Sequence, residues 1–203
     1  MPNPCSSVVR HINETTWKKV AQKYFTDKAF ALDRNVIRFL AYTNKRCQEL
    51  SSYVRNAIYG KELSQENPYL PDDLLIARAP VYREGSKGKY QQIAVNSQEF
   101  LVIEPGVLLT DDETGYKYWS VLVEPIDLES NSAIALKILD EDSAVANEKN
   151  IRQMQDKLQQ TLDYAAKNAL KKKIDNTRKA FDNVVYVYAL TVHSRNIRCC
   201  SIR

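Results

Sequence analysis

The sequence predicts an α/β domain that is interrupted by a module of antiparallel strands. The apolar run 36–41 is typical of a strand, and from Lys45 onward apolar residues recur at helical spacing. The stretch 69–139 contains several strand-like segments separated by turn sequences, with no helical period between them. The apolar strand 184–192 needs the strand 36–41 as a sheet partner, so an interrupted domain fits better than two domains in series.

The composition is that of a globular protein. The 203 residues are 44% hydrophobic and 27% charged, enough for one ordinary domain or two small ones. A net charge of +4 permits an anionic partner without demanding one. No apolar run approaches the length of a membrane span, and the first residues lack the apolar core of a signal peptide. We therefore expect a cytoplasmic protein with no membrane partner.

The first elements form a helix and then a strand–loop–helix unit. Trp17, Val20 and Tyr24 lie at helical spacing in 14–25, and Asn13 is a suitable N-cap. The second helix begins near Lys45. Its apolar face consists of Cys47, Leu50, Val54 and Ile58. Gly60 is a suitable stop for this helix. The loop between strand and helix, 42–44, lies where open α/β sheets bind ligands.

The middle of the chain predicts a small antiparallel barrel or a curved sheet, of SH3-like or OB-like size. Hairpin sequences at 84–89 and 111–115 separate its strands. Tyr82, Tyr118 and Trp119 are candidates for stacking on bases, while core packing or cross-strand pairing explains the same aromatic residues.

A further helix is expected to run from Ile151 through Lys173. Its apolar face comprises Ile151, Met154, Leu158, Leu162, Ala165 and Ala169. The lysine-rich run 167–179 fits either a solvated helix face or a nucleic-acid contact.

The cysteines are Cys5, Cys47, Cys199 and Cys200. Adjacent Cys199 and Cys200 cannot complete a C-x-x-C pair, and only His11 and His193 could assist them. Free thiols explain this set better than a zinc site, so no metal ligands are assigned.

Three segments, in this order, resemble superfamily 1 DNA helicases of the Dda-like and RecD-like branch. The segment 36–60, VIRFLAYTNKRCQELSSYVRNAIYG, resembles the strand, loop and helix that open the second motor domain. The segment 69–82, YLPDDLLIARAPVY, is similar to the first strand of that family's SH3-like insert. The segment 184–193, VVYVYALTVH, is similar to the entry into helicase motif V. The likeness covers roughly residues 35–193.

The resemblance implies a partial RecA-like domain, of the P-loop NTPase type, interrupted by an SH3-like β-barrel. It divides the chain into 1–68 and 141–193, both belonging to the motor domain, with the insert at 69–140 and an aberrant tail at 194–203. It also implies single-stranded DNA as the partner. The residues that would hold the strand are Thr43, Asn44, Lys45, Arg46, Thr191 and His193. A helix start with basic residues suits a phosphate, although capping alone also explains Thr43 and Asn44.

Several motifs of a complete helicase are missing from these residues. The chain has five glycines, none in a Walker A arrangement, and neither the end of motif V nor motif VI is present. ATP and Mg²⁺ are implied for a complete helicase, but we expect this chain alone to bind neither and to hydrolyse no ATP. A partner chain carrying the Walker motifs is one way to supply them. Cys47 and Ser51 depart from the family's usual Val and Asn, which puts the finer DNA contacts of that helix in doubt.

The tail 194–203, SRNIRCCSIR, predicts a frameshift or small deletion after His193. A back-translation read one base forward allows the Gln-Gly that usually ends motif V. The expected function is therefore a fragment of an ATP-dependent DNA helicase. Two alternatives stay open: a non-catalytic module that binds single-stranded nucleic acid, and a purely structural interaction protein.

Overall fold

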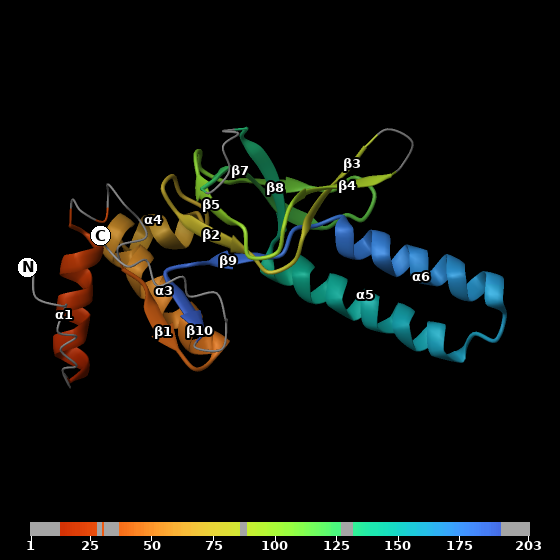
Figure 1. Ribbon diagram of the computed structural model, residues 1–203, viewed down its shortest axis with the longest axis horizontal. Helices are drawn as coiled ribbons and strands as arrows, with labels where there is room; N and C mark the ends of the chain where they lie inside the picture. The colour runs from red at the N-terminus through yellow and green to blue at the C-terminus, as the bar shows by residue number, and fades with distance from the viewer. Residues whose placement is uncertain (1–12, 28–29, 31–36, 86–88, 127–131, 192–203) are drawn as a thin grey trace, which may run out of the picture. The chain divides into compact units, whose positions relative to one another are not determined.

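The computed structural model describes residues 13–27, 30, 37–85, 89–126 and 132–191 (Figure 1). These residues form a mixed α/β structure with five helices and an antiparallel six-stranded sheet beside smaller sheets. The chain divides into two compact units. We call 1–61 with 188–203 the parallel unit, and 62–187 the antiparallel unit. His193 and the tail 194–203 lie outside the described residues.

The parallel unit is built on two short strands. Strand β1 (Phe39–Ala41) pairs in parallel with β10 (Ala189–Thr191), which confirms the expected pairing of these two segments. Helix α1 (Glu14–Phe25) begins at Asn13, whose side chain accepts the N–H of Thr16. Helix α3 (Asn44–Tyr59) packs on the strands and ends at Gly60, whose φ of 85° favours glycine.

The described core of the parallel unit contains several aromatic rings. One cluster of buried residues comprises Ala41, Cys47, Leu50 and Ala189, with Trp17 and Phe39 packed against it. The buried Phe25 ring adds contacts with three further rings, those of Phe30, Phe39 and Tyr188, at centroid distances of 5.0, 5.2 and 6.4 Å. Edge-to-face and tilted ring pairs of this kind stabilise a fold by more than the burial of their apolar area alone.

The expected single strand 184–192 is wrong, because the structure breaks it in two. Strand β9 (Val184–Tyr186) joins the antiparallel unit, and β10 joins the parallel unit. Val187 and Tyr188, between them, are buried to 0% and 1% exposure. Alternation alone does not show where a strand changes its pairing partner.

The antiparallel unit contains the six-stranded sheet. Its strand order is β6-β7-β5-β2-β9, and β8 pairs with β7. The strands are β2 (Leu74–Ala77), β5 (Glu99–Val102), β6 (Val107–Thr110), β7 (Lys117–Pro125) and β8 (Ile134–Leu139), together with β9. A separate hairpin is formed by β3 (Val81–Glu84) and β4 (Tyr90–Ala94).

The antiparallel character expected for the insert is confirmed, but a closed barrel is not found in the described part of the chain. The path of strands ends at β6 and β9, which do not pair with each other, and the β3–β4 hairpin forms its own sheet. Strand β9 also enters this sheet from outside the expected insert, by pairing with β2. The described strands therefore form an open sheet and not a closed barrel.

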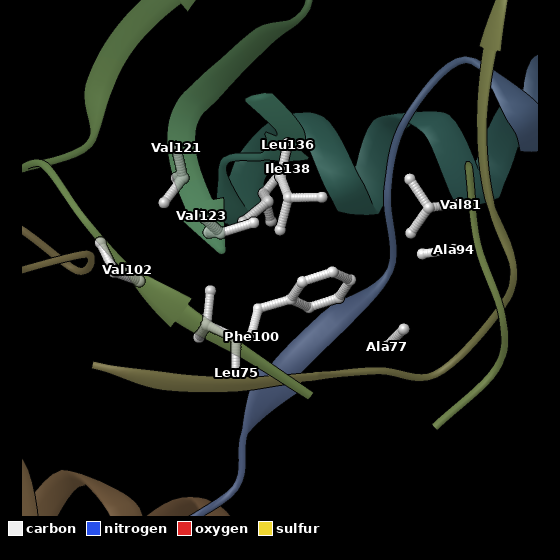
Figure 2. Close-up of a cluster of buried hydrophobic side chains, with 10 residues drawn as sticks. All are labelled: Leu75, Ala77, Val81, Ala94, Phe100, Val102, Val121, Val123, Leu136 and Ile138. Atoms are coloured by element: carbon white, nitrogen blue, oxygen red, sulfur yellow. The ribbon is translucent and has the colours of Figure 1, made fainter. Parts of the chain in front are cut away.

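The core of the antiparallel unit contains a cluster of ten buried hydrophobic residues (Figure 2). Figure 2 shows the ring of Phe100 among the aliphatic side chains that β2, β5, β7 and β8 contribute. Alternate residues of β7, Val121, Val123 and Pro125, are buried, as the two-residue period of a strand requires. The full cluster is Leu75, Ala77, Val81, Ala94, Phe100, Val102, Val121, Val123, Leu136 and Ile138.

The expected helix from Ile151 through Lys173 is also wrong, because the structure has two helices. Helix α5 (Glu141–Gln160) ends at Thr161, whose hydroxyl donates to the Lys157 carbonyl at 2.7 Å. Helix α6 (Tyr164–Lys179) begins at Asp163, whose carboxylate accepts the Ala166 N–H at 2.6 Å. Leu162, expected on the apolar face, is 94% exposed in the connection. These local hydrogen bonds compete with a continuous helix.

A short helix, α4 (Lys61–Glu66), follows α3 and precedes the sheet. Among the described residues, no helix combines the length and the apolar character that crossing a membrane requires.

Candidate nucleic-acid interface

The candidate interface begins at the carboxyl end of β1. Thr43 has extended backbone angles and caps α3, because its hydroxyl oxygen accepts the N–H of Arg46 at 3.1 Å. Asn44 is the first helical residue, and it is exposed, as is Thr43. The capping interpretation of Thr43 is therefore confirmed. Capping occupies one N–H group and leaves the dipole at the helix start favourable to an anion.

Two basic residues follow in the first turn of α3, and both are exposed. The Arg46 guanidinium forms an ion pair with Glu49 at 2.8 Å and lies 5.9 Å from the centre of the Trp17 ring. Lys45 has no ion pair within the described part of the chain. Lys45 therefore offers a cation that no carboxylate of the described residues neutralises, whereas Arg46 contacts both Glu49 and Trp17.

Thr191 lies beside this loop because of the strand register. It is the residue of β10 that pairs with Ala41, the last residue of β1. Parallel strands end at the same edge of a sheet, so the segments that carry Thr43 and Thr191 leave that edge together. Thr191 is half-buried, and the residues at 42–46 are exposed. The structure thus brings five of the six predicted residues to one edge, while the sixth, His193, lies outside the described residues.

Two aromatic residues at this edge were not among the predicted site residues. Tyr42, directly before Thr43, is 79% exposed. Trp17 of α1 is half-buried, with its ring 5.5 Å from that of Phe39 and flanked by the cations of Lys18 and Arg46. The loop position of Tyr42 was available from the sequence. The place of Trp17 beside Arg46 was not, because helical spacing indicated only that it faces a core.

The aromatic candidates of the antiparallel unit are engaged in packing. The Tyr82 ring lies 5.0 Å from the Lys179 ammonium group, and the Tyr118 ring lies 5.5 Å from that of Lys137. Trp119 packs against Tyr69 with a centroid distance of 6.1 Å. All three rings are half-buried, which favours the interpretation that they stabilise the unit.

The chemistry at the β1–α3 edge is that of binding. Hydroxyl groups, backbone N–H groups and cations hold phosphate oxygens through hydrogen bonds and charge. Within the described ranges, no group of three or more His, Cys, Asp or Glu residues is placed to hold a metal ion. Cys47 is buried and forms no disulfide within those ranges, and the other cysteines lie outside them.

Comparison with known proteins identifies no family. No protein-family model matches the chain, and no curated protein matches it. The link to helicases therefore rests on the three sequence segments and their order.

Proposed function

We propose that this chain supplies the part of a superfamily 1 DNA helicase that grips single-stranded DNA. In this proposal the parallel unit corresponds to a portion of the second RecA-like motor domain, and the antiparallel sheet corresponds to its SH3-like insert. The observation that carries the proposal is the parallel pairing of Ala41 with Thr191. That pairing sets the loop resembling the opening segment of the motor domain beside the strand resembling motif V.

The strand would be held mainly through its phosphates. Lys45 provides a cation that has no ion pair within the described ranges, and the start of α3 provides N–H groups near Thr43. Arg46 is a weaker contributor, because Glu49 already neutralises it at 2.8 Å. Such contacts bind DNA without regard to sequence and weaken with rising salt.

The ATP-hydrolysing half of the motor is not supplied by these 203 residues in this proposal. ATP and Mg²⁺ would be held by a partner chain with a Walker A motif, and the residues at the β1–α3 edge would contact neither of them. We expect no ATP hydrolysis from the purified chain. ATP hydrolysis above background, with a preparation free of other ATPases, would contradict this assignment.

Oligonucleotide binding over a salt series tests the DNA contact. We expect Lys45→Ala to weaken binding of a labelled oligothymidylate. The slope of log K against log salt should become shallower by about 0.7, the contribution of one phosphate contact on a single strand. Lys19→Ala is the matched control, because Lys19 is an exposed lysine of the same unit on α1. Equal losses for the two variants would mean that net charge alone attracts the DNA.

Thr43 allows a second test that separates capping from DNA contact. Thr43→Ser keeps an oxygen that accepts the Arg46 N–H, so we expect stability and binding close to those of the wild type. Thr43→Val removes that oxygen at similar volume and should lower both. If oligonucleotide binding is unchanged in Thr43→Val while the melting temperature falls, Thr43 caps the helix without contributing to a DNA site.

A further inference from the structure

The outer part of the α5–α6 hairpin is a second basic surface, in the other unit of the protein. From Gln155 to Lys173, every residue is described and none is buried. Helices α5 and α6 lie side by side in Figure 1, joined by 161–163. Leu162 and Tyr164, at the connection, are 94% and 78% exposed. This part of the hairpin therefore presents its side chains to solvent.

The first half of α6 concentrates lysines without compensating carboxylates. Between Tyr164 and Ile174 the helix has four lysines and no acidic residue: Lys167, Lys171, Lys172 and Lys173. None of the four has an ion pair within the described residues. The two flanking carboxylates are engaged, since Asp163 accepts the Ala166 N–H and Asp175 pairs with Lys179 at 2.5 Å. The other acidic residue of the outer hairpin is Asp156, on α5.

Three of these residues share one face of α6. At 100° per residue, Tyr164, Lys167 and Lys171 fall within a sector of about 60°. Lys167 and Lys171 are four residues apart, so their like charges destabilise the helix. Lys167 is half-buried and Lys171 is exposed.

We propose that the stripe Tyr164–Lys167–Lys171 binds single-stranded nucleic acid. The two lysines contact successive phosphates, and the exposed Tyr164 ring stacks on a base. A duplex offers phosphates without unstacked bases, so the tyrosine selects the single strand. This inference rests on the proposed function for the class of its ligand, but it assigns a separate site in the antiparallel unit.

Charge reversal in the full chain tests the stripe. We expect Lys167→Glu to weaken binding of an oligothymidylate of about 20 nucleotides by about tenfold at low salt, and to lower the salt slope. The same variant should change the melting temperature little, because its new carboxylate attracts Lys171 one helical turn later and repels Asp163 one turn earlier. Lys149→Glu is the matched control, an exposed lysine of the same hairpin with the same change of charge. A loss of affinity as large in the control overturns the inference.

The tyrosine has its own test. Tyr164→Phe should bind as the wild type does, whereas Tyr164→Ala should lose about fivefold or more in affinity with an unchanged salt slope, because stacking involves no counterion. A blunt duplex of the same length should bind more weakly than the single strand. Equal affinity for duplex and single strand, or an unchanged affinity in Tyr164→Ala, rules out stacking and overturns the site as proposed.

The proposals for the two DNA sites can be contradicted independently of each other. If Lys167→Glu lowers affinity and Lys45→Ala does not, the α6 stripe is supported and the proposed role of the β1–α3 edge is contradicted. If only Lys45→Ala lowers affinity, the proposed function stands and the stripe is overturned. If both lower affinity, the double variant should lose the product of the two factors, because the sites share no residue.

Discussion

The two units of this protein are stabilised in different ways. The antiparallel unit buries a cluster that includes Leu75, Phe100, Val121 and Leu136 at 0% exposure, and hairpins or short connections bring most of its strands together. The parallel unit has two three-residue strands from distant parts of the chain, and it depends on rings around Phe25. A local antiparallel sheet can complete its own core, whereas a parallel pair requires helices and long connections.

The basic surfaces of the two units also differ, in how far their charged side chains take part in local contacts. At the start of α3, Arg46 pairs with Glu49, Thr43 caps the helix, and Lys45 has no ion pair among the residues that the structure describes. On α6, Lys167 and Lys171 have no ion pair within the described residues. The α3 surface therefore includes a helix cap and an ion pair, whereas these two α6 lysines form no ion pair among the described residues. Binding measurements on both therefore show whether position in the fold or exposed charge governs affinity.

The largest expected effect is on the core of the antiparallel unit. Phe100→Ala removes a fully buried ring, and we expect the free energy of unfolding of that unit to fall by about 3–5 kcal/mol. Urea unfolding followed by the fluorescence of Trp119, in a Trp17→Phe background, reports on this unit. A loss below about 1 kcal/mol would mean that the unit repacks around the cavity, contrary to a tightly packed core.

The next effect concerns the buried carboxylate of Asp182, whose side chain is 1% exposed. It accepts hydrogen bonds from the Arg83 guanidinium at 2.8 Å and from the Lys137 N–H at 2.7 Å, and so ties β3 to β8. We expect Asp182→Ala to cost about 2–3 kcal/mol, since Arg83 is partly hydrated. Arg152→Ala, which breaks the exposed pair with Glu148, should cost at most about 0.5 kcal/mol. Similar losses in chemical denaturation would show that burial of Asp182 is unimportant.

A smaller effect is expected in the parallel unit. The Tyr53 hydroxyl donates to the Lys18 carbonyl at 2.8 Å, and this bond links α3 to α1. Tyr53→Phe keeps the ring, so we expect a loss of about 1 kcal/mol in the free energy of unfolding. Tyr24→Phe is the control, because Tyr24 is 53% exposed on α1. If the two variants unfold at the same denaturant concentration, this hydrogen bond does not contribute to the packing of α1.

The smallest effect depends on pH. The hydrogen bond from the Thr114 hydroxyl, at 2.7 Å, holds the pKa of Asp111 below its ordinary value of 3.8. Because the folded pKa is depressed, the stabilisation is present above pH 3.8 and is lost as pH falls through the folded pKa. Thr114→Val should therefore flatten the acid end of the stability profile. An NMR titration of Asp111 that gives the same pKa in both proteins would contradict this cause.

Local patterns predicted much of the secondary structure, and their failures have physical reasons. Asn13 and Thr43 cap helices as expected, because capping depends on neighbours within three residues. The helix predicted through Leu162 was wrong because Asp163 has extended backbone angles and its carboxylate caps a new helix by accepting the Ala166 N–H. The apolar period continues across that break, so the pattern alone indicated a single helix.

The candidate interface shows the same division. The residues at 43–46 were predicted from the resemblance to helicases, supported by their place after a strand, and the cap at Thr43 is confirmed. The contact of Trp17 with Arg46 was not predicted, because it joins two helices that are far apart in sequence. The break of 184–192 into β9 and β10 was missed for the same reason, since pairing partners are not encoded in alternation.

The sequence by itself determined the order of elements, the helix caps, the antiparallel character of the middle and the basic runs at 45–46 and 167–173. These features depend on interactions between residues a few positions apart. Only the tertiary structure decided that Thr191 lies beside the loop at Thr43, that the buried Asp182 pairs with Arg83, and that Lys167 and Lys171 have no ion pairs within the described residues. Those properties depend on which distant segments meet, and that follows from burying the most apolar surface at once.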